Sequence, residues 1–235
     1  MVPNLDNPDP MLFVVLASFV VVVVALIVVG VIYNYIQMKK RREDLVILAQ
    51  RLGLRLYTGK DHQIASSYRF LDKLSKGSNR YAYNILSGEW QKHDVLAFDY
   101  HYETRSTDSK GRRKTNHHHF SFFIVHLPRD FPELKISREG FLSKIAQAMG
   151  FDDIDFESHE FSRRFCVRCS DKKFAYDICN AQMIEYLLGN TDLNIEIEGS
   201  ALALGFDRRL NMEAIEHNLG RLLKIHSLIP NYLFD

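Results

Sequence analysis

The chain has 235 residues, and its 30 Lys and Arg nearly balance 29 Asp and Glu, for a formal net charge of +1. This balance excludes a global electrostatic attraction to nucleic acid or to acidic substrates, so any such partner would need a local patch. The 3 cysteines cannot form a disulfide framework, which is typical of a protein in a reducing compartment.

The N-terminal part contains one long uncharged stretch, residues 10–38, which is apolar on all sides of a helix. A helix needs about 20 apolar residues to cross roughly 30 Å of hydrocarbon. We therefore expect a transmembrane helix over residues 11–36, preceded by a short extracytoplasmic tail of residues 1–10. The lipid bilayer is the first partner that this pattern predicts.

The charges at the two ends of this stretch predict its orientation. Residues 1–10 contain no Lys or Arg, whereas four consecutive cations follow the apolar stretch directly. The positive-inside rule then places the N-terminus outside and the rest of the chain in the cytoplasm, as a single-pass protein of the inner membrane. Two tyrosines precede the cations, where aromatic side chains favour the headgroup level. The residues expected at the membrane interface are Tyr33, Tyr35, Lys39, Lys40, Arg41 and Arg42.

The helix is expected to continue past the membrane. Leu45, Leu48, Ala49 and Leu52 follow the three-four spacing of one helix face, and Gly53 is a plausible end. We therefore predict a juxtamembrane helix extension over residues 37–53, followed by a cytosolic domain over residues 54–235.

The first half of this domain predicts a short strand, a helix and an antiparallel meander. The meander strands are rich in aromatic and β-branched residues and are separated by turn-forming residues. The expected elements are a strand over 54–57, a helix over 64–74, and meander strands over 80–88, 95–104 and 117–127. Residues 105–115 form a polar turn between the last two strands.

The second half predicts further helices and strands. Phe131-Pro132 is expected to break the chain, and Asn180 is expected to cap a helix that ends at Gly189. The other expected elements are a helix over 138–149, a strand over 161–169, a hairpin over 195–206 that turns at Gly199-Ser200, and a final helix over 211–225. Because strand and helix signals occur in blocks, they favour an α+β fold in which several helices pack on an antiparallel sheet.

Histidines are the first candidate site. Neighbouring residues of a strand point to opposite faces, so only His117 and His119 of the trio His117-His118-His119 project together. If the strand register placed His101 across from them, three imidazoles could hold a zinc ion with an open position. A solvated hairpin rim explains the same residues, and no fixed ligand spacing supports a metal. We therefore predict no cofactor and keep His101, His117 and His119 as metal candidates only.

A second candidate is the basic tip of the predicted hairpin. Lys110, Arg112, Arg113 and Lys114 could contact anionic headgroups at about 1 kcal/mol per cation. A charged loop without a partner is the alternative. Nucleic acid is not expected, because no interleaved aromatic motif accompanies the charges.

A series of apolar motifs resembles a stretch found in uncharacterised bacterial membrane proteins that are grouped as a domain of unknown function. The motifs are Phe156-Glu157-Ser158, Phe161, Phe165-x-Val167, Asp171-x-x-Phe174-Ala175 and Met183-x-Glu185-Tyr186-Leu187-Leu188, within residues 130–205. Members of that group carry one or two N-proximal anchors. The resemblance implies a bacterial inner-membrane protein and supplies no catalytic residues.

No sequence motif for covalent or nucleotide chemistry accompanies these features, because the chain lacks a GxSxG elbow, a Walker loop and a glycine-rich dinucleotide turn. We therefore expect a non-enzymatic, membrane-tethered cytosolic module that binds an unknown protein partner or the inner leaflet. The alternative is a metal-dependent hydrolase that uses His101, His117 and His119.

Overall fold

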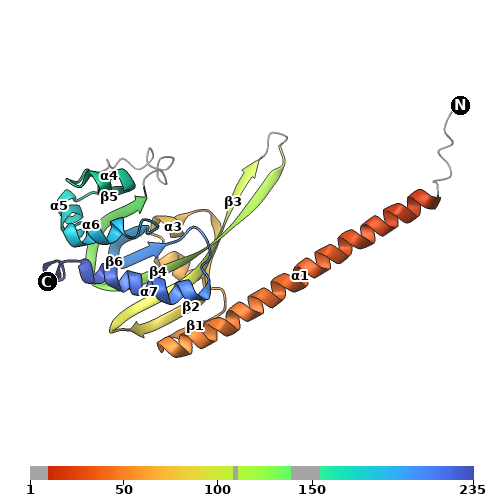
Figure 1. Ribbon diagram of the computed structural model, residues 1–235, viewed down its shortest axis with the longest axis horizontal. Helices are drawn as coiled ribbons and strands as arrows, with labels where there is room; N and C mark the ends of the chain where they lie inside the picture. Colours follow the sequence, from red (N-terminus) through yellow and green to blue (C-terminus); the bar gives the residue numbers. More distant parts are fainter. Residues whose placement is uncertain (1–9, 108–110, 139–153) are drawn as a thin grey trace. The chain divides into compact units, whose positions relative to one another are not determined.

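The computed structural model describes residues 10–107, 111–138 and 154–235, which form a long N-terminal helix and an α+β unit (Figure 1). Contacts divide the chain into two units, Met1–Asp44 and Leu45–Asp235. The expected α+β class with an antiparallel sheet is confirmed.

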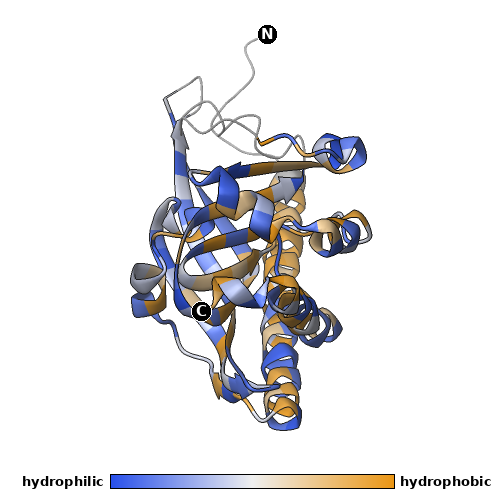
Figure 2. Ribbon diagram, turned by 90° about the vertical axis from the view of Figure 1, so that its left-hand side faces the viewer, coloured by the Kyte–Doolittle hydropathy of each residue, from blue (hydrophilic) through white to orange (hydrophobic). Residues whose placement is uncertain are grey.

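Helix α1 (Pro10–Leu52) combines the predicted transmembrane segment and its extension in one continuous helix. Its 43 residues correspond to about 65 Å at ~1.5 Å per residue. The side chains of Met11 and of residues 13–38 are exposed all round, and Figure 2 shows the corresponding stretch of α1 as hydrophobic. By length and composition, this helix can cross a membrane.

Six strands form one sheet in which every pair is antiparallel. They are β1 (Arg55–Tyr57), β2 (Ser78–Trp90), β3 (His93–Thr107), β4 (Arg113–Arg138), β5 (Phe165–Cys169) and β6 (Ile195–Gly205). Strands β2, β3 and β4 form the predicted meander. The long strand β4 pairs with three neighbours: with β3 along residues 113–125, with β5 along 134–138 and with β6 along 122–136.

Alternation along β4 separates two buried clusters, because successive side chains of a strand point to opposite faces. Phe122 packs with buried side chains of α2 (His62–Ser67) and of the α3 region (Asp72–Ser75). Phe123 belongs to a larger cluster that includes Leu45 and Leu48 of α1. The remaining helices of the described residues are α4 (His159–Arg164), α5 (Lys172–Ile178), α6 (Ala181–Leu188), α7 (Met212–Leu228) and the 3-10 turn η2 (Asn231–Leu233).

The single helix expected over 64–74 is wrong, because the chain leaves the helix at Tyr68 and begins α3 at Asp72. The break allows Leu71 and Leu74, both 0% exposed, to pack in the same core. It also brings the backbone N–H of Asp72 to 2.8 Å from a carboxylate oxygen of Glu196, which accepts its hydrogen bond. Residues 68–71, about one helical turn, therefore leave the helix, and a contact with a strand distant in sequence takes the place of that turn.

The strand expected over 161–169 is half wrong, because its first residues form α4. Ser158 caps this helix by accepting a hydrogen bond from the backbone N–H of Phe161 at 3.3 Å. The rings of Phe161 and Phe165 then stack at 5.3 Å, as side chains four residues apart can when a helical turn brings them together. In the sequence, these two phenylalanines are separated by polar residues and arginines, and this pattern led to the prediction of a strand.

The break at Phe131-Pro132 and the hairpin at Gly199-Ser200 are also wrong. Strand β4 continues through Pro132 with register shifts, and β6 is one strand along which both expected arms pair with β4. Gly199 adopts φ +54, a left-handed conformation that glycine adopts readily. Residues 127–130 bulge from β4 opposite Ser200, so the glycine marks an irregularity in a strand and not a turn.

Helix starts with a local capping signal are confirmed. Asn180 accepts a hydrogen bond from the N–H of Met183 at 3.1 Å, and α6 ends before Gly189. Asn211 accepts from the N–H of Ala214 at 3.0 Å at the start of α7. The helix predicted over 138–149 falls almost wholly, and the tail over 1–10 falls except for its last residue, outside the described residues.

Candidate functional sites

The register of β3 and β4 decides which histidines meet. His101 lies directly opposite His119, and Glu103 lies directly opposite His117. Directly opposed residues project on the same face of a sheet, as do residues two apart along one strand. Four titratable side chains of this hairpin therefore share one face.

Three of these side chains converge more closely than the fourth. The Nε2 atom of His101 lies 3.1 Å from Nδ1 of His117, which lies 3.5 Å from Oε1 of Glu103. One ligand atom from each of His101, Glu103 and His117 falls within 4.8 Å of the others. We call these three residues the His-Glu cluster.

The fourth side chain, His119, takes a different position from the one that the zinc hypothesis gave it. Its ring lies 4.8 Å from that of His101, while its Nδ1 lies 3.1 Å from the hydroxyl of Tyr83. The structure thus brings two of the three candidate histidines together and adds Glu103, which sequence reasoning missed. The sequence did contain a signal for Glu103: it lies two residues after His101 on a predicted strand, so the two side chains project on the same face.

Asn79 of β2 contacts two members of the His-Glu cluster. Its backbone oxygen lies 3.0 Å from Nδ1 of His101, and its side-chain amide donates to Oε1 of Glu103 at 2.6 Å. Asn79 has φ +49, in the left-handed region that Asn tolerates better than most residues. This conformation presents its carbonyl and its amide to the same cluster.

The electrostatics favour a neutral imidazole at His101 and at His119 and an ionised carboxylate at Glu103. Burial lowers the pKa of His101 and of His119. The hydrogen bond from Asn79 lowers the pKa of Glu103, and the neighbouring imidazoles act in the same direction. These are the protonation states in which the side chains can act as metal ligands.

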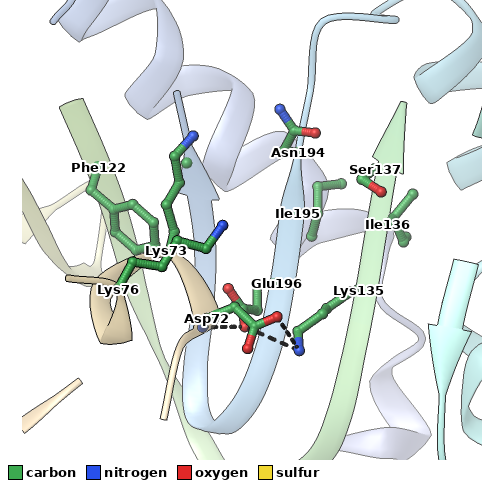
Figure 3. Close-up of a pocket in the computed structure, with 11 residues that line it drawn as sticks. Asp72, Lys73, Lys76, Phe122, Lys135, Ile136, Ser137, Asn194, Ile195 and Glu196 are labelled. Atoms are coloured by element: carbon green, nitrogen blue, oxygen red, sulfur yellow. Dashed lines mark hydrogen bonds and ion pairs between the residues drawn. The ribbon is translucent and has the colours of Figure 1, made fainter. Parts of the chain in front are cut away.

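A second candidate site is a pocket between α3, β4 and β6, with an empty space of about 600 Å³ that includes its open mouth (Figure 3). Its lining residues are Asp72, Lys73, Lys76, Phe122, Lys135, Ile136, Ser137, Asn194, Ile195, Glu196 and Gly205. The ring of Phe122 and the two isoleucines supply apolar walls, and three lysines supply positive charge. No sequence motif marked this site, because α3, β4 and β6 are distant in sequence.

One side of the pocket holds an ammonium group among carboxylates, which we call the Lys135 cluster. The Nζ atom of Lys135 lies 2.6 Å from Asp72 and 3.9 Å from Glu196, and it also pairs with Glu133. Burial opposes the charge of Lys135, but these carboxylates raise its pKa above the ordinary value. Burial raises the pKa of Glu196 to about 7.

Two polar atoms of the pocket lining lack hydrogen-bond partners among the described residues. They are Oγ of Ser137 and Oδ1 of Asn194, both buried. Lys73 at the same site pairs with Asp207 at 2.6 Å, and burial lowers its pKa. A buried polar atom without a partner is costly, so the pocket offers unmet hydrogen-bonding capacity beside apolar walls.

Most of the residues predicted to contact the membrane are exposed. Arg112, Arg113 and Lys114 are exposed where the hairpin of β3 and β4 turns, whereas Lys110 falls outside the described residues. On α1, the predicted interface residues are exposed except Arg41, which is half-buried. The three cysteines are buried and form no disulfide among the described residues.

Together these features define a membrane protein with one candidate spanning helix among the described residues, followed by an α+β unit. Its fold is similar to that of a mycobacterial protein, in the "crystal structure of the mycobacterial trehalose monomycolate transport factor A, TtfA". The TM-score is 0.55 at 10% sequence identity, and the match covers 81% of this chain and 95% of that chain. No family model and no curated protein matches the sequence. At this identity, the likeness shows the fold alone.

Proposed function

We propose that this chain is a single-pass protein of the bacterial inner membrane with its N-terminus outside. Its α+β unit is then a cytosolic, non-enzymatic module that binds a protein partner or the inner leaflet. The observation that carries the proposal is the exposed apolar surface of α1 over residues 13–38, which ends at four cations. The resemblance to bacterial membrane proteins of unknown function supports the same interpretation.

Free energy explains why that surface needs a bilayer. Burying one Val, Leu or Ile side chain is worth about 1.5–3 kcal/mol, and this helix exposes such residues on all sides. Charges at the cytoplasmic end then hold the orientation. The structural neighbour is a transport factor, but at 10% identity it shares the fold alone, so the proposal rests on α1.

A topology experiment tests the orientation. A reporter fused after Asp235 should be accessible in the cytoplasm, and one fused before Met1 should lie outside. Replacing the cations 39–42 with Gln should produce mixed orientations. As a matched control, replacing Arg112, Arg113 and Lys114 with Gln should change nothing, because these residues lie far from the membrane-spanning stretch in sequence. A protected C-terminal reporter in the native chain would contradict the proposal.

Nanodiscs test whether the module binds the inner leaflet or needs a protein. The full chain is reconstituted in neutral and in anionic lipid, and amide hydrogen exchange of residues 111–117 is compared. If these residues contact headgroups, their amides should exchange more slowly in anionic lipid, because each cation adds about 1 kcal/mol of attraction to the anionic surface. The variant with Arg112, Arg113 and Lys114 changed to Gln should show no such slowing. Equal exchange in both lipids would reject leaflet binding and leave the protein partner.

The pocket favours a second candidate function, the binding of an anionic amphiphile. Apolar walls suit a chain, while the ammonium of Lys76 and the hydroxyl of Ser137, whose Oγ lacks a partner among the described residues, suit an anionic head. A fluorescent fatty acid is a suitable probe. Lys76→Glu and Ser137→Val should each weaken its binding about tenfold or more, whereas Lys224→Glu on the exposed side of α7 should not. Equal binding by all variants would remove this candidate.

A further inference from the structure

We infer that the His-Glu cluster is a binding site for a divalent transition-metal ion of the Zn²⁺ type, with Nε2 of His101, Nδ1 of His117 and a carboxylate oxygen of Glu103 as its ligands. This inference is independent of the proposed membrane role. It rests on the spacing of the three ligand atoms, on the residues that orient them and on the access of solvent to the cluster.

The spacing of the ligand atoms matches tetrahedral coordination. With Zn–N and Zn–O distances of about 2.0–2.2 Å, two ligands at a tetrahedral angle lie about 3.3 Å apart. In the structure, the two imidazole nitrogens lie 3.1 Å apart, and Nδ1 of His117 lies 3.5 Å from Oε1 of Glu103. All three ligand atoms lie within 4.8 Å of one another. Small side-chain movements would therefore complete the site.

The residues that orient the ligands are also in place. A metal-binding histidine usually donates its other ring N–H to an oxygen, which fixes its tautomer and ring orientation. The contact between Nδ1 of His101 and the carbonyl oxygen of Asn79 does this and leaves the Nε2 lone pair to face the metal. The ring of Tyr81 stacks on His101 at 4.5 Å, and the Asn79 amide holds Glu103.

The cluster combines rigidity with access. His101 is 3% exposed, whereas the side chain of His117 is 57% exposed and that of Glu103 is 14% exposed. The buried histidine and the carboxylate provide a preformed half-site, and His117 closes it from the solvent side. Three protein ligands leave a fourth coordination position for water or another small ligand.

A hydrogen bond offers a metal-free account of the same geometry. Nδ1–H of a neutral His117 could donate to Nε2 of His101, with no ion involved. Both accounts need these two histidines, but only metal binding predicts stoichiometric uptake of an ion and a dependence on the carboxylate. The experiment therefore measures the ion directly.

The test uses the full chain in detergent, purified without a histidine tag and equilibrated with excess Zn²⁺ before desalting. Metal analysis should find about one ion per chain for the native protein, and Zn²⁺ should raise its thermal midpoint. His117→Ala and Glu103→Gln should each weaken Zn²⁺ binding at least tenfold in competition with a chelating dye. His117 is on the solvent side and Glu103 is partly exposed, and circular dichroism checks that the variants fold.

Two neighbouring histidines are matched controls. His118 points to the opposite face and stacks on Tyr102 at 4.4 Å, and His119 contacts Tyr83, so His118→Ala and His119→Ala should bind Zn²⁺ as the native chain does. The inference is overturned if the native chain retains no stoichiometric Zn²⁺. It is also overturned if Glu103→Gln binds normally, or if His119→Ala loses as much affinity as His117→Ala.

Discussion

The His-Glu cluster and the Lys135 cluster each bring three metal-ligating side chains within 4.8 Å of one another, yet they differ in what balances their charge. In the Lys135 cluster, the ammonium of the chain itself contacts Asp72, Glu133 and Glu196. In the His-Glu cluster, two imidazoles lie beside one carboxylate, and the neutral Asn79 orients His101 and Glu103. Proximity of ligand atoms is therefore not sufficient to indicate a metal site, because a lysine can occupy the place of the ion.

Removing the ammonium from the Lys135 cluster should have the largest effect. Lys135→Met keeps the apolar stem but leaves three carboxylates close together, so we expect the free energy of unfolding to fall by about 3–5 kcal/mol. Thermal or denaturant unfolding of the full chain in detergent measures this loss. Lys173→Met is the control, because Lys173 pairs with Asp177 on an exposed helix face, and its loss should be undetectable. Native-like stability of Lys135→Met would show that the ammonium does not hold this cluster together.

The second prediction concerns the pH dependence of the same cluster. Burial raises the pKa of Glu196 to about 7 in the folded chain, from 4.5 as the reference value. The folded state therefore holds this proton more tightly than the unfolded state does. The contribution of Glu196 to stability is present below pH 4.5 and is lost as the pH rises towards 7, by up to about 3 kcal/mol.

Glu196→Gln should remove that loss. The variant should gain stability relative to the native chain at pH 8 and little at pH 4, because its amide can still accept the N–H of Asp72. Unfolding curves recorded at intervals from pH 4 to pH 8 measure the difference. A constant offset between the two proteins at every pH would contradict the raised pKa.

The smallest effect is expected at the His-Glu cluster. Asn79→Gly keeps the left-handed backbone and its carbonyl but removes the amide that donates to Glu103. The pKa of Glu103 should rise towards its ordinary value, since that hydrogen bond is the main cause of its lowering. Overall stability should change by no more than about 1 kcal/mol.

A carbon NMR titration of labelled glutamate carboxyls measures this pKa. Glu196, which belongs to the Lys135 cluster, is the internal control and should keep the same pKa in both proteins. An unchanged Glu103 titration would show that Asn79 does not tune the carboxylate.

The outcomes along the chain separate local from distant causes. The start of α6 at Asn180 was predictable because a capping side chain and the N–H that it accepts lie three residues apart. The division of residues 64–74 into α2 and α3 was not, because it depends on burial of Leu71 and on a carboxylate of β6. Gly199 was misread because a glycine permits a turn and a bulge equally well, and only pairing with β4 distinguishes them.

The candidate site follows the same rule. The sequence placed His117 and His119 on one face of a strand, which needs only the period of two. It did not reveal that Glu103 faces His117 or that Asn79 orients both Glu103 and His101, because these contacts depend on the register of three strands.

The sequence by itself determined α1, its apolar length and the cations that follow it, because a membrane-spanning helix satisfies its backbone hydrogen bonds locally and needs only composition and length. It also determined the α+β class through the order of its periodic segments. Only the tertiary structure decided which side chains meet at the His-Glu and Lys135 clusters. The Lys135 cluster joins segments distant along the chain, and the His-Glu cluster depends on the register of β2, β3 and β4, which no local pattern shows.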